Sequence, residues 1–167
     1  VVNVTNCNNY GNINATGNGG TGGIAGLVNC AIATSTYNFN DCVSVGTVTL
    51  NAGWGGGLFG YSGGSCVGNI NFNKCLSVSN VIDNSSTGRT AGFAVTQNNS
   101  NGVKFIATDC EVISYVSSKG TTNVSNGVAF TFDITSGLEI NASNSLLSND
   151  LFKVVETNNA LRVPFKN

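Results

Sequence analysis

The chain has 167 residues, of which 41% are apolar and only 9% are charged, and its formal net charge is −1. Globular domains usually carry about 25% charged residues, so amides and hydroxyls must hydrate most of this surface. The near-zero net charge favours neither nucleic-acid binding nor attraction to an anionic membrane, no apolar run is long enough to insert in a membrane, and the ample Val, Ile, Leu and Phe argue against disorder.

Short strands are predicted from the start of the chain, at residues 2–4, 37–39 and 69–72, and the last at 161–165. These segments alternate apolar with polar residues and are rich in β-branched and aromatic side chains. No segment keeps an apolar stripe at helical spacing, and Asn and Gly interrupt every stretch. The pattern therefore predicts an all-β chain.

A pattern recurs along the whole chain. Its anchor residues are Cys7, Cys42, Cys75, Cys110 and Ser145, spaced 35, 33, 35 and 35 residues apart. Four positions relative to the anchor are almost wholly apolar: five before (Val2, Tyr37, Ile70, Phe105, Ile140), three before (Val4, Phe39, Phe72, Ala107, Ala142), three after (Tyr10, Val45, Val78, Ile113, Ser148) and six after (Ile13, Val48, Val81, Val116, Leu151). In a solenoid each residue stacks on its counterpart about 4.8 Å away, so equivalent positions must resemble each other. The repeat predicts a parallel β-helix of about five rungs of 33–35 residues.

A glycine-rich block keeps the same period. Gly-Gly-Ile-Ala-Gly at 22–26 corresponds to Gly-Gly-Leu-Phe-Gly at 56–60, with weaker copies at 91–95, 126–130 and 159–163. Tight turns and close backbone packing explain this block better than a phosphate site, because no Gly-Lys-Ser/Thr follows and no helix begins there. One domain, 1–167, is expected, with repeats at 1–35, 36–68, 69–103, 104–138 and 139–167.

Two polar columns agree with parallel stacking. The residue before the anchor is Asp41, Lys74 and Asp109 in successive repeats, so opposite charges would alternate along a ladder. The position four before the anchor is Asn in four repeats (Asn3, Asn38, Asn71 and Asn141). Those amides should face outward, since both neighbours are apolar, and could form a hydrogen-bonded ladder.

The residues around the first anchor, Asn-Cys-Asn-Asn-Tyr-Gly-Asn-Ile at 6–13, and the block Gly-Gly-Ile-Ala-Gly-Leu at 22–27 resemble the Gly-Gly-Ile-x-Gly repeats of β-helical microbial surface proteins, sometimes called GLUG-type repeats. The resemblance is strong in the first two repeats, moderate in the third and faint in the last two. It implies a right-handed parallel β-helix and an adhesin-like, cell-surface or extracellular role. It implies no catalytic residues.

Cysteines and glycosylation sequons also favour a secreted or cell-surface location. The six cysteines, an even number, are candidates for disulfides: Cys7, Cys30, Cys42, Cys66, Cys75 and Cys110. The anchor cysteines fit equally well as small buried apolar residues in a column. Candidate N-glycosylation sites are Asn3, Asn14, Asn84, Asn98, Asn123 and Asn141, although so Asn-rich a chain also produces sequons by chance.

Nothing in the sequence favours catalysis or a cofactor. Without His there is no Ser–His or Cys–His nucleophile, and without Cys-x-x-Cys pairs the usual zinc signatures are missing. We therefore expect no enzyme activity, no metal and no cofactor. Trp54 and Tyr61 could stack on sugars, but packing within the core or a loop is the favoured interpretation of each.

The ends of the chain lead to two functional hypotheses. The chain starts at Val1 rather than Met, which suggests a mature product or an excerpt of a longer protein. Predicted strands reach both ends without a cap, so Val2, Val4, Leu161 and Val163 are candidate assembly edges. A structural filament that stacks copies head to tail is the first hypothesis. The alternative is an adhesin or glycan-binding module whose ends are covered by flanking domains of a longer chain.

Overall fold

A computed structural model describes the backbone of residues 1–28, 32–62, 67–85, 89–96, 104–118, 130–132, 139–143 and 146–147. These residues form strands joined by turns and loops, which confirms the all-β prediction. No helix occurs among them, and hence none that is long and apolar enough to cross a membrane.

The strands belong to four parallel sheets. The first sheet contains β1 (Val2–Thr5), β6 (Thr36–Asn40), β10 (Asn69–Asn73), β14 (Lys104–Thr108) and β18 (Glu139–Ser143) in that order. The second contains β2 (Asn8–Asn9) and β3 (Ile13–Ala15) beside β7 (Val43–Leu50), then β11 (Leu76–Asp83), β15 (Glu111–Val112) and β16 (Tyr115–Ser118), and β19 (Leu146–Leu147).

The other two sheets are built from the glycine-rich blocks. The third sheet contains β4 (Gly20–Gly22), β8 (Trp54–Gly56) and β12 (Arg89–Ala91). The fourth contains β5 (Ala25–Val28), β9 (Phe59–Ser62), β13 (Ala94–Thr96) and β17 (Phe130–Phe132). The glycine-rich blocks at 22–26, 56–60 and 91–95 form tight arches that join the third sheet to the fourth.

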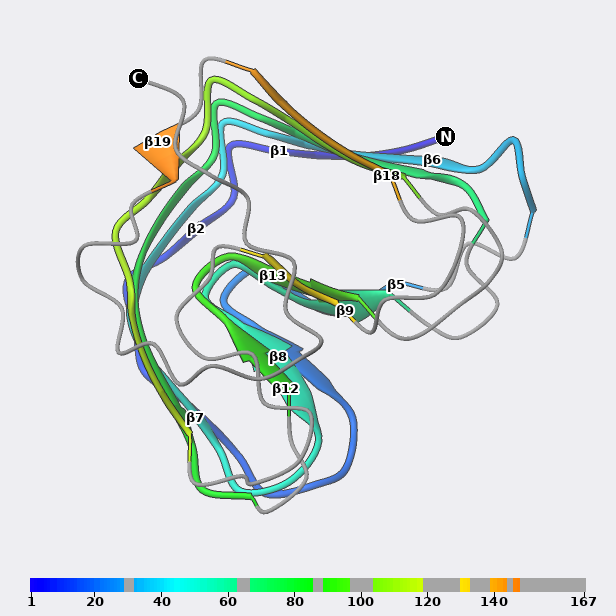
Figure 1. Ribbon diagram of the computed structural model, residues 1–167. Helices are drawn as coiled ribbons and strands as arrows, with labels where there is room; N and C mark the ends of the chain where they lie inside the picture. The colour runs from blue at the N-terminus through cyan, green and yellow to red at the C-terminus, as the bar shows by residue number, and fades with distance from the viewer. Residues whose placement is uncertain are drawn as a thin grey trace.

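The chain visits the four sheets in a fixed order. β1 to β5 form the first pass, β6 to β9 the second and β10 to β13 the third, each running through the first, second, third and fourth sheets in turn. Figure 1 shows successive passes superimposed, with β8, β9, β12 and β13 on the concave side of the angle between the first and second sheets. Each strand of the second pass therefore pairs with its counterparts one pass earlier and one pass later.

The predicted register of the first sheet is confirmed. Val2 pairs with Tyr37, Tyr37 with Ile70, and Ile70 with Phe105. The column that contains Phe39 and Phe72 and the asparagine column pair in the same way. The spacing of the anchor residues thus predicts which residues are neighbours in this sheet.

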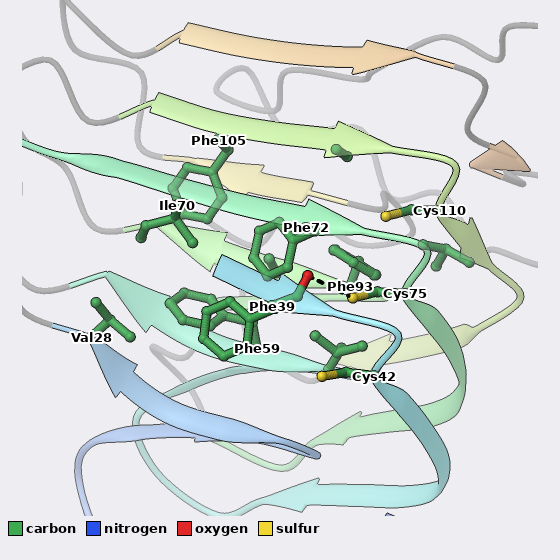
Figure 2. Close-up of a cluster of buried hydrophobic side chains, with 14 of the residues drawn as sticks. Val28, Phe39, Cys42, Phe59, Ile70, Phe72, Cys75, Phe93, Phe105 and Cys110 are labelled. Atoms are coloured by element: carbon green, nitrogen blue, oxygen red, sulfur yellow. Dashed lines mark hydrogen bonds between the residues drawn. The ribbon is translucent and has the colours of Figure 1, made fainter. Parts of the chain in front are cut away.

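The apolar core lies between the first and fourth sheets. The ring of Phe59 on β9 meets those of Phe39, Phe72 and Phe105 edge to face, at centroid separations of 5.6, 5.7 and 6.0 Å. Phe39 and Phe72 stack on each other at 5.4 Å, because they are equivalent residues of adjacent strands. Figure 2 shows these rings beside the column of Cys42, Cys75 and Cys110.

The residues on the inward face of the second sheet differ from the apolar columns that the repeat predicted. Val48 and Val81 are buried, whereas Val45 and Val78 are half-buried and lie three residues away, on the opposite face of the same strands. The inward positions around them are serines: Ser44, Ser77, Ser79 and Ser114 are all buried. The apolar column three after the anchor is therefore not part of the main core.

Candidate functional site

The first pass leaves one edge of every sheet without a partner strand. β1, β2, β4 and β5 each end the strand order of their sheets within the described part of the chain. A parallel edge of this kind presents backbone N–H and C=O groups that another strand can pair with. This edge, formed by β1 to β5, is called the β1 edge below.

Apolar columns that are buried elsewhere are exposed at the β1 edge. Val2 is 45% exposed while Ile70 of the same column is fully buried, and Leu27 is 53% exposed. Val4 is half-buried, whereas Phe39, its counterpart on β6, is buried. The next layer of a stack would cover these side chains, as the second pass covers the first from the other side.

The anchor cysteines of the second, third and fourth passes belong to the core. Cys42, Cys75 and Cys110 are buried, and Cys7, at the β1 edge, is exposed. All four are free thiols. The Cys75 Sγ donates to the Phe39 carbonyl oxygen at 3.3 Å, which ties one pass to the previous one (Figure 2). Cys30 and Cys66, the other disulfide candidates, lie outside the described residues.

Two of these thiols, Cys42 and Cys75, are weaker acids than a free cysteine, whereas the hydrogen bond with Cys75 lowers the pKa of Cys110. Desolvation raises the pKa of Cys42 from 9.0 to about 11. A hydrogen bond with the neighbouring Cys110 thiol, together with burial, raises the pKa of Cys75 further. Nucleophilic or metal-binding chemistry requires the thiolate, so the arrangement suits packing. Among the described residues no group of three or more Cys, Asp or Glu could hold a metal ion.

The predicted charge ladder occupies a corner of the backbone. Asp41, Lys74 and Asp109 are exposed and have φ values of 52, 52 and 53°, and Asn6 has 54° in the first pass. Each N–H of the first three corners donates to the carbonyl oxygen at the end of the next strand of the first sheet, at 2.9 Å for Asn6, Asp41 and Lys74. The common feature of this column is thus a left-handed conformation. Charge pairs at such exposed positions contribute little.

The asparagine column forms the expected ladder. The Asn38 amide donates to Asn3 Oδ1 at 2.8 Å, and the Asn71 amide donates to Asn38 Oδ1 at 2.7 Å. The Oδ1 of Asn71 is buried and has no partner, because Ile106 pairs with Asn71 in the next strand. The backbone of Asn141 continues the column on β18.

A second asparagine ladder was not predicted. The Asn51 amide donates to Asn14 Oδ1 at 2.9 Å, and the Asn84 amide donates to Asn51 Oδ1 at 3.3 Å. Its signal in the sequence was an Asn seven or nine residues after the anchor, a spacing that varies between repeats. Because the spacing varies, an alignment on the anchor residues does not place these asparagines in one column.

These ladders distinguish the sequon asparagines that the structure describes. Asn3, Asn14 and Asn84 are all exposed. Asn3 and Asn14 accept a ladder bond through Oδ1, which leaves the amide nitrogen, the atom that would carry a glycan, outside the ladder. Asn84 uses its amide nitrogen as the ladder donor. Asn98 and Asn123, and the edge residues Leu161 and Val163, lie outside the described residues.

Sequence reasoning also missed a hollow near the β1 edge. Its volume is about 300 Å³, and its lining residues are Asn18, Gly19, Gly53, Trp54 and Tyr61. Only the two aromatic residues had been considered as sugar contacts. The glycines beside them gave no signal, because the sequence does not show which loops become neighbours.

Comparison with known proteins finds no matching family model, no similar curated protein and no similar solved structure.

Proposed function

We propose that the chain is a structural building block of an extracellular or cell-surface filament. Its four sheets would form a single β-solenoid, a right-handed parallel β-helix, and copies would stack head to tail through the β1 edge. The observation that carries this proposal is the β1 edge itself, where pairing groups and exposed apolar columns coincide. A repeating pass order supports it, because a further copy would supply the same columns again.

The contact would be heterologous. β1 of one copy would pair with the last strand of the first sheet in the next, as β6 pairs with β1 within the chain. Val2 and Val4 would then be covered by the strand of the neighbouring copy. Heterologous contacts that do not close into a ring generate open filaments. The low charge of the chain suits this assembly, because little repulsion separates the copies.

The test is to place a charge on the β1 edge. Val2→Asp and Val4→Asp should abolish assembly, since stacking would bury an unpaired carboxylate, while circular dichroism stays that of the parent. Asn80→Asp is the matched control, because Asn80 is exposed on β11 and lies away from the edge. Sedimentation velocity and negative-stain electron microscopy give the readout.

Filaments or concentration-dependent oligomers are expected for the parent and for Asn80→Asp, and monomers for the two edge variants. A parent that remains monomeric at the highest soluble concentration would contradict the proposal. So would edge variants that assemble as well as the control.

A further inference from the structure

The hollow lies where two loops of adjacent passes meet the start of β8. Residues 18 and 19 precede β4, Gly53 precedes β8, and Trp54 and Tyr61 belong to β8 and β9. The Trp54 backbone N–H donates to the Gly19 carbonyl oxygen at 3.0 Å, so the two loops are held together by the same bonding that joins the passes.

Glycines allow the loops and the Tyr61 ring to pack closely beside the hollow. Trp54 pairs with Gly20 of the first pass, so no side chain lies in the equivalent position below the indole. A Cβ built on Gly20 would collide with the Gly26 carbonyl oxygen and would lie 2.5 Å from the Tyr61 ring, so backbone and ring already fill the place of a side chain at this position. Gly53 has a φ of 81° and lies so close to Gly19 that a Cβ would be 2.4 Å from its carbonyl oxygen. Larger residues at 20 and 53 are thus excluded.

The aromatic wall is held in a defined orientation. The rings of Trp54 and Tyr61 pack edge to face, with centroids 4.9 Å apart and planes at 80°. Both side chains are half-buried, and Asn18 is exposed at the rim. An ordered aromatic pair beside an accessible amide is a small recognition surface that needs little rearrangement to bind a ligand.

The chemistry of the lining selects the ligand. The lining residues that the structure describes are all uncharged, so none of these five offers a charged partner to a phosphate, a carboxylate or a cation. An aromatic face attracts the weakly positive C–H groups of a pyranose ring, and an Asn amide both donates to and accepts from hydroxyl groups. A volume of about 300 Å³ is at the lower limit of ligand pockets, which suits one sugar unit. We propose that this hollow binds a single neutral pyranose residue of a glycan.

The proposal is independent of filament assembly, and the chain offers its own reporter. Trp54 is the only tryptophan of the sequence, so intrinsic tryptophan fluorescence reads this hollow alone. Methyl glycosides of glucose, galactose, mannose and N-acetylglucosamine would be titrated into the parent chain, with cyclohexanol as an apolar comparison. At least one glycoside should change the emission of Trp54 and saturate with a Kd of about 1 to 10 mM.

Variants then locate the binding. Asn18→Ala should weaken the affinity about fivefold, the effect of one net hydrogen bond, and its exposed position makes unfolding an unimportant concern. Trp54→Phe keeps a ring but no fluorophore, so its binding is followed by saturation-transfer NMR and should also weaken. Tyr10→Ala, which removes an aromatic residue that is 70% exposed and lies outside the hollow, should leave the affinity unchanged.

Three outcomes would overturn the proposal. The emission of Trp54 could stay constant with all four glycosides, or respond to cyclohexanol alone, which would mark an apolar crevice. An equal loss of affinity in Tyr10→Ala and Asn18→Ala would place the sugar elsewhere. None of these results depends on whether copies of the chain assemble.

Discussion

A single backbone dihedral explains the column that precedes the anchor. Asn6, Asp41, Lys74 and Asp109 share the left-handed conformation, which L-residues adopt at a cost and which Asn and Asp tolerate best. Three of the four residues are therefore those expected at such a corner. Lys74 is the exception, and it sits between two aspartates. If the backbone conformation matters more, replacing Lys74 by Asn should increase stability. If the charge ladder matters more, the replacement should decrease stability.

Lys74→Asn should stabilise the protein by about 0.5 to 1 kcal/mol, because Asn tolerates the left-handed region better than Lys. Lys74→Ala, which removes the charge without improving the conformational preference, should be nearly neutral. Urea denaturation at low ionic strength measures both free energies of unfolding. If the charge ladder mattered more than the dihedral, both variants would lose stability.

The arch is the element that the repeat specifies most strictly. Gly23 and Gly57 lie at its tip, and a Cβ on Gly57 would lie 2.3 Å from both the Ser77 hydroxyl and the Gly92 carbonyl oxygen. Ser77 donates to that same carbonyl at 2.8 Å, and Ser114 donates to it at 3.1 Å. The arch therefore packs against serines because its buried carbonyl groups need donors that are small.

Gly57→Ala should destabilise the chain by about 2 to 3 kcal/mol, since backbone and a short hydroxyl cannot move aside easily. Gly17→Ala is the matched control, because a Cβ there meets nothing within 4 Å; it should change stability by less than about 0.5 kcal/mol. Thermal and urea unfolding of both variants provide the comparison. Equal effects of the two substitutions would show that the arch is not closely packed.

The arch also shows how far the sequence could be interpreted. Alignment on the anchor predicted the pairing of Val2, Tyr37 and Ile70, because equivalent residues in stacked strands need similar partners. It could not show that Ser77 rather than Val78 faces inward, since that choice depends on the arch approaching from the other side. The hollow beside Trp54 could not be predicted from the sequence for the same reason. The repeat predicts contacts between equivalent residues of successive passes. It does not predict contacts between residues at different positions of the repeat.

At the scale of the whole molecule, the buried thiols couple folding to alkaline pH. The pKa of Cys42 rises from 9.0 to about 11 on folding, so between these values the unfolded chain releases a proton that the folded chain keeps. The contribution of Cys42 ionisation to the free energy of unfolding is complete below pH 9 and is lost as the pH rises to about 11.

Under reducing conditions, the free energy of unfolding should fall between pH 9 and pH 11, and Cys42→Ala should make the fall less steep. Cys7→Ala, which changes the exposed anchor and keeps the buried Cys42 thiol, is the comparison variant and should show a steeper fall than Cys42→Ala. Comparison with the parent cancels the contributions of the ionisable groups that all three proteins share. Identical slopes in the two variants would mean that burial of Cys42 does not control its ionisation.

The pairing of each pass with only its two neighbours has a mechanical consequence. Force applied to the first strand loads the hydrogen bonds between β1 and β6 first, and it leaves the later passes unloaded until β1 has separated. Each pass releases 33 to 35 residues, or about 120 Å of extended chain. The molecule would yield in a series of similar steps, and a fibre made from it would lengthen before it breaks.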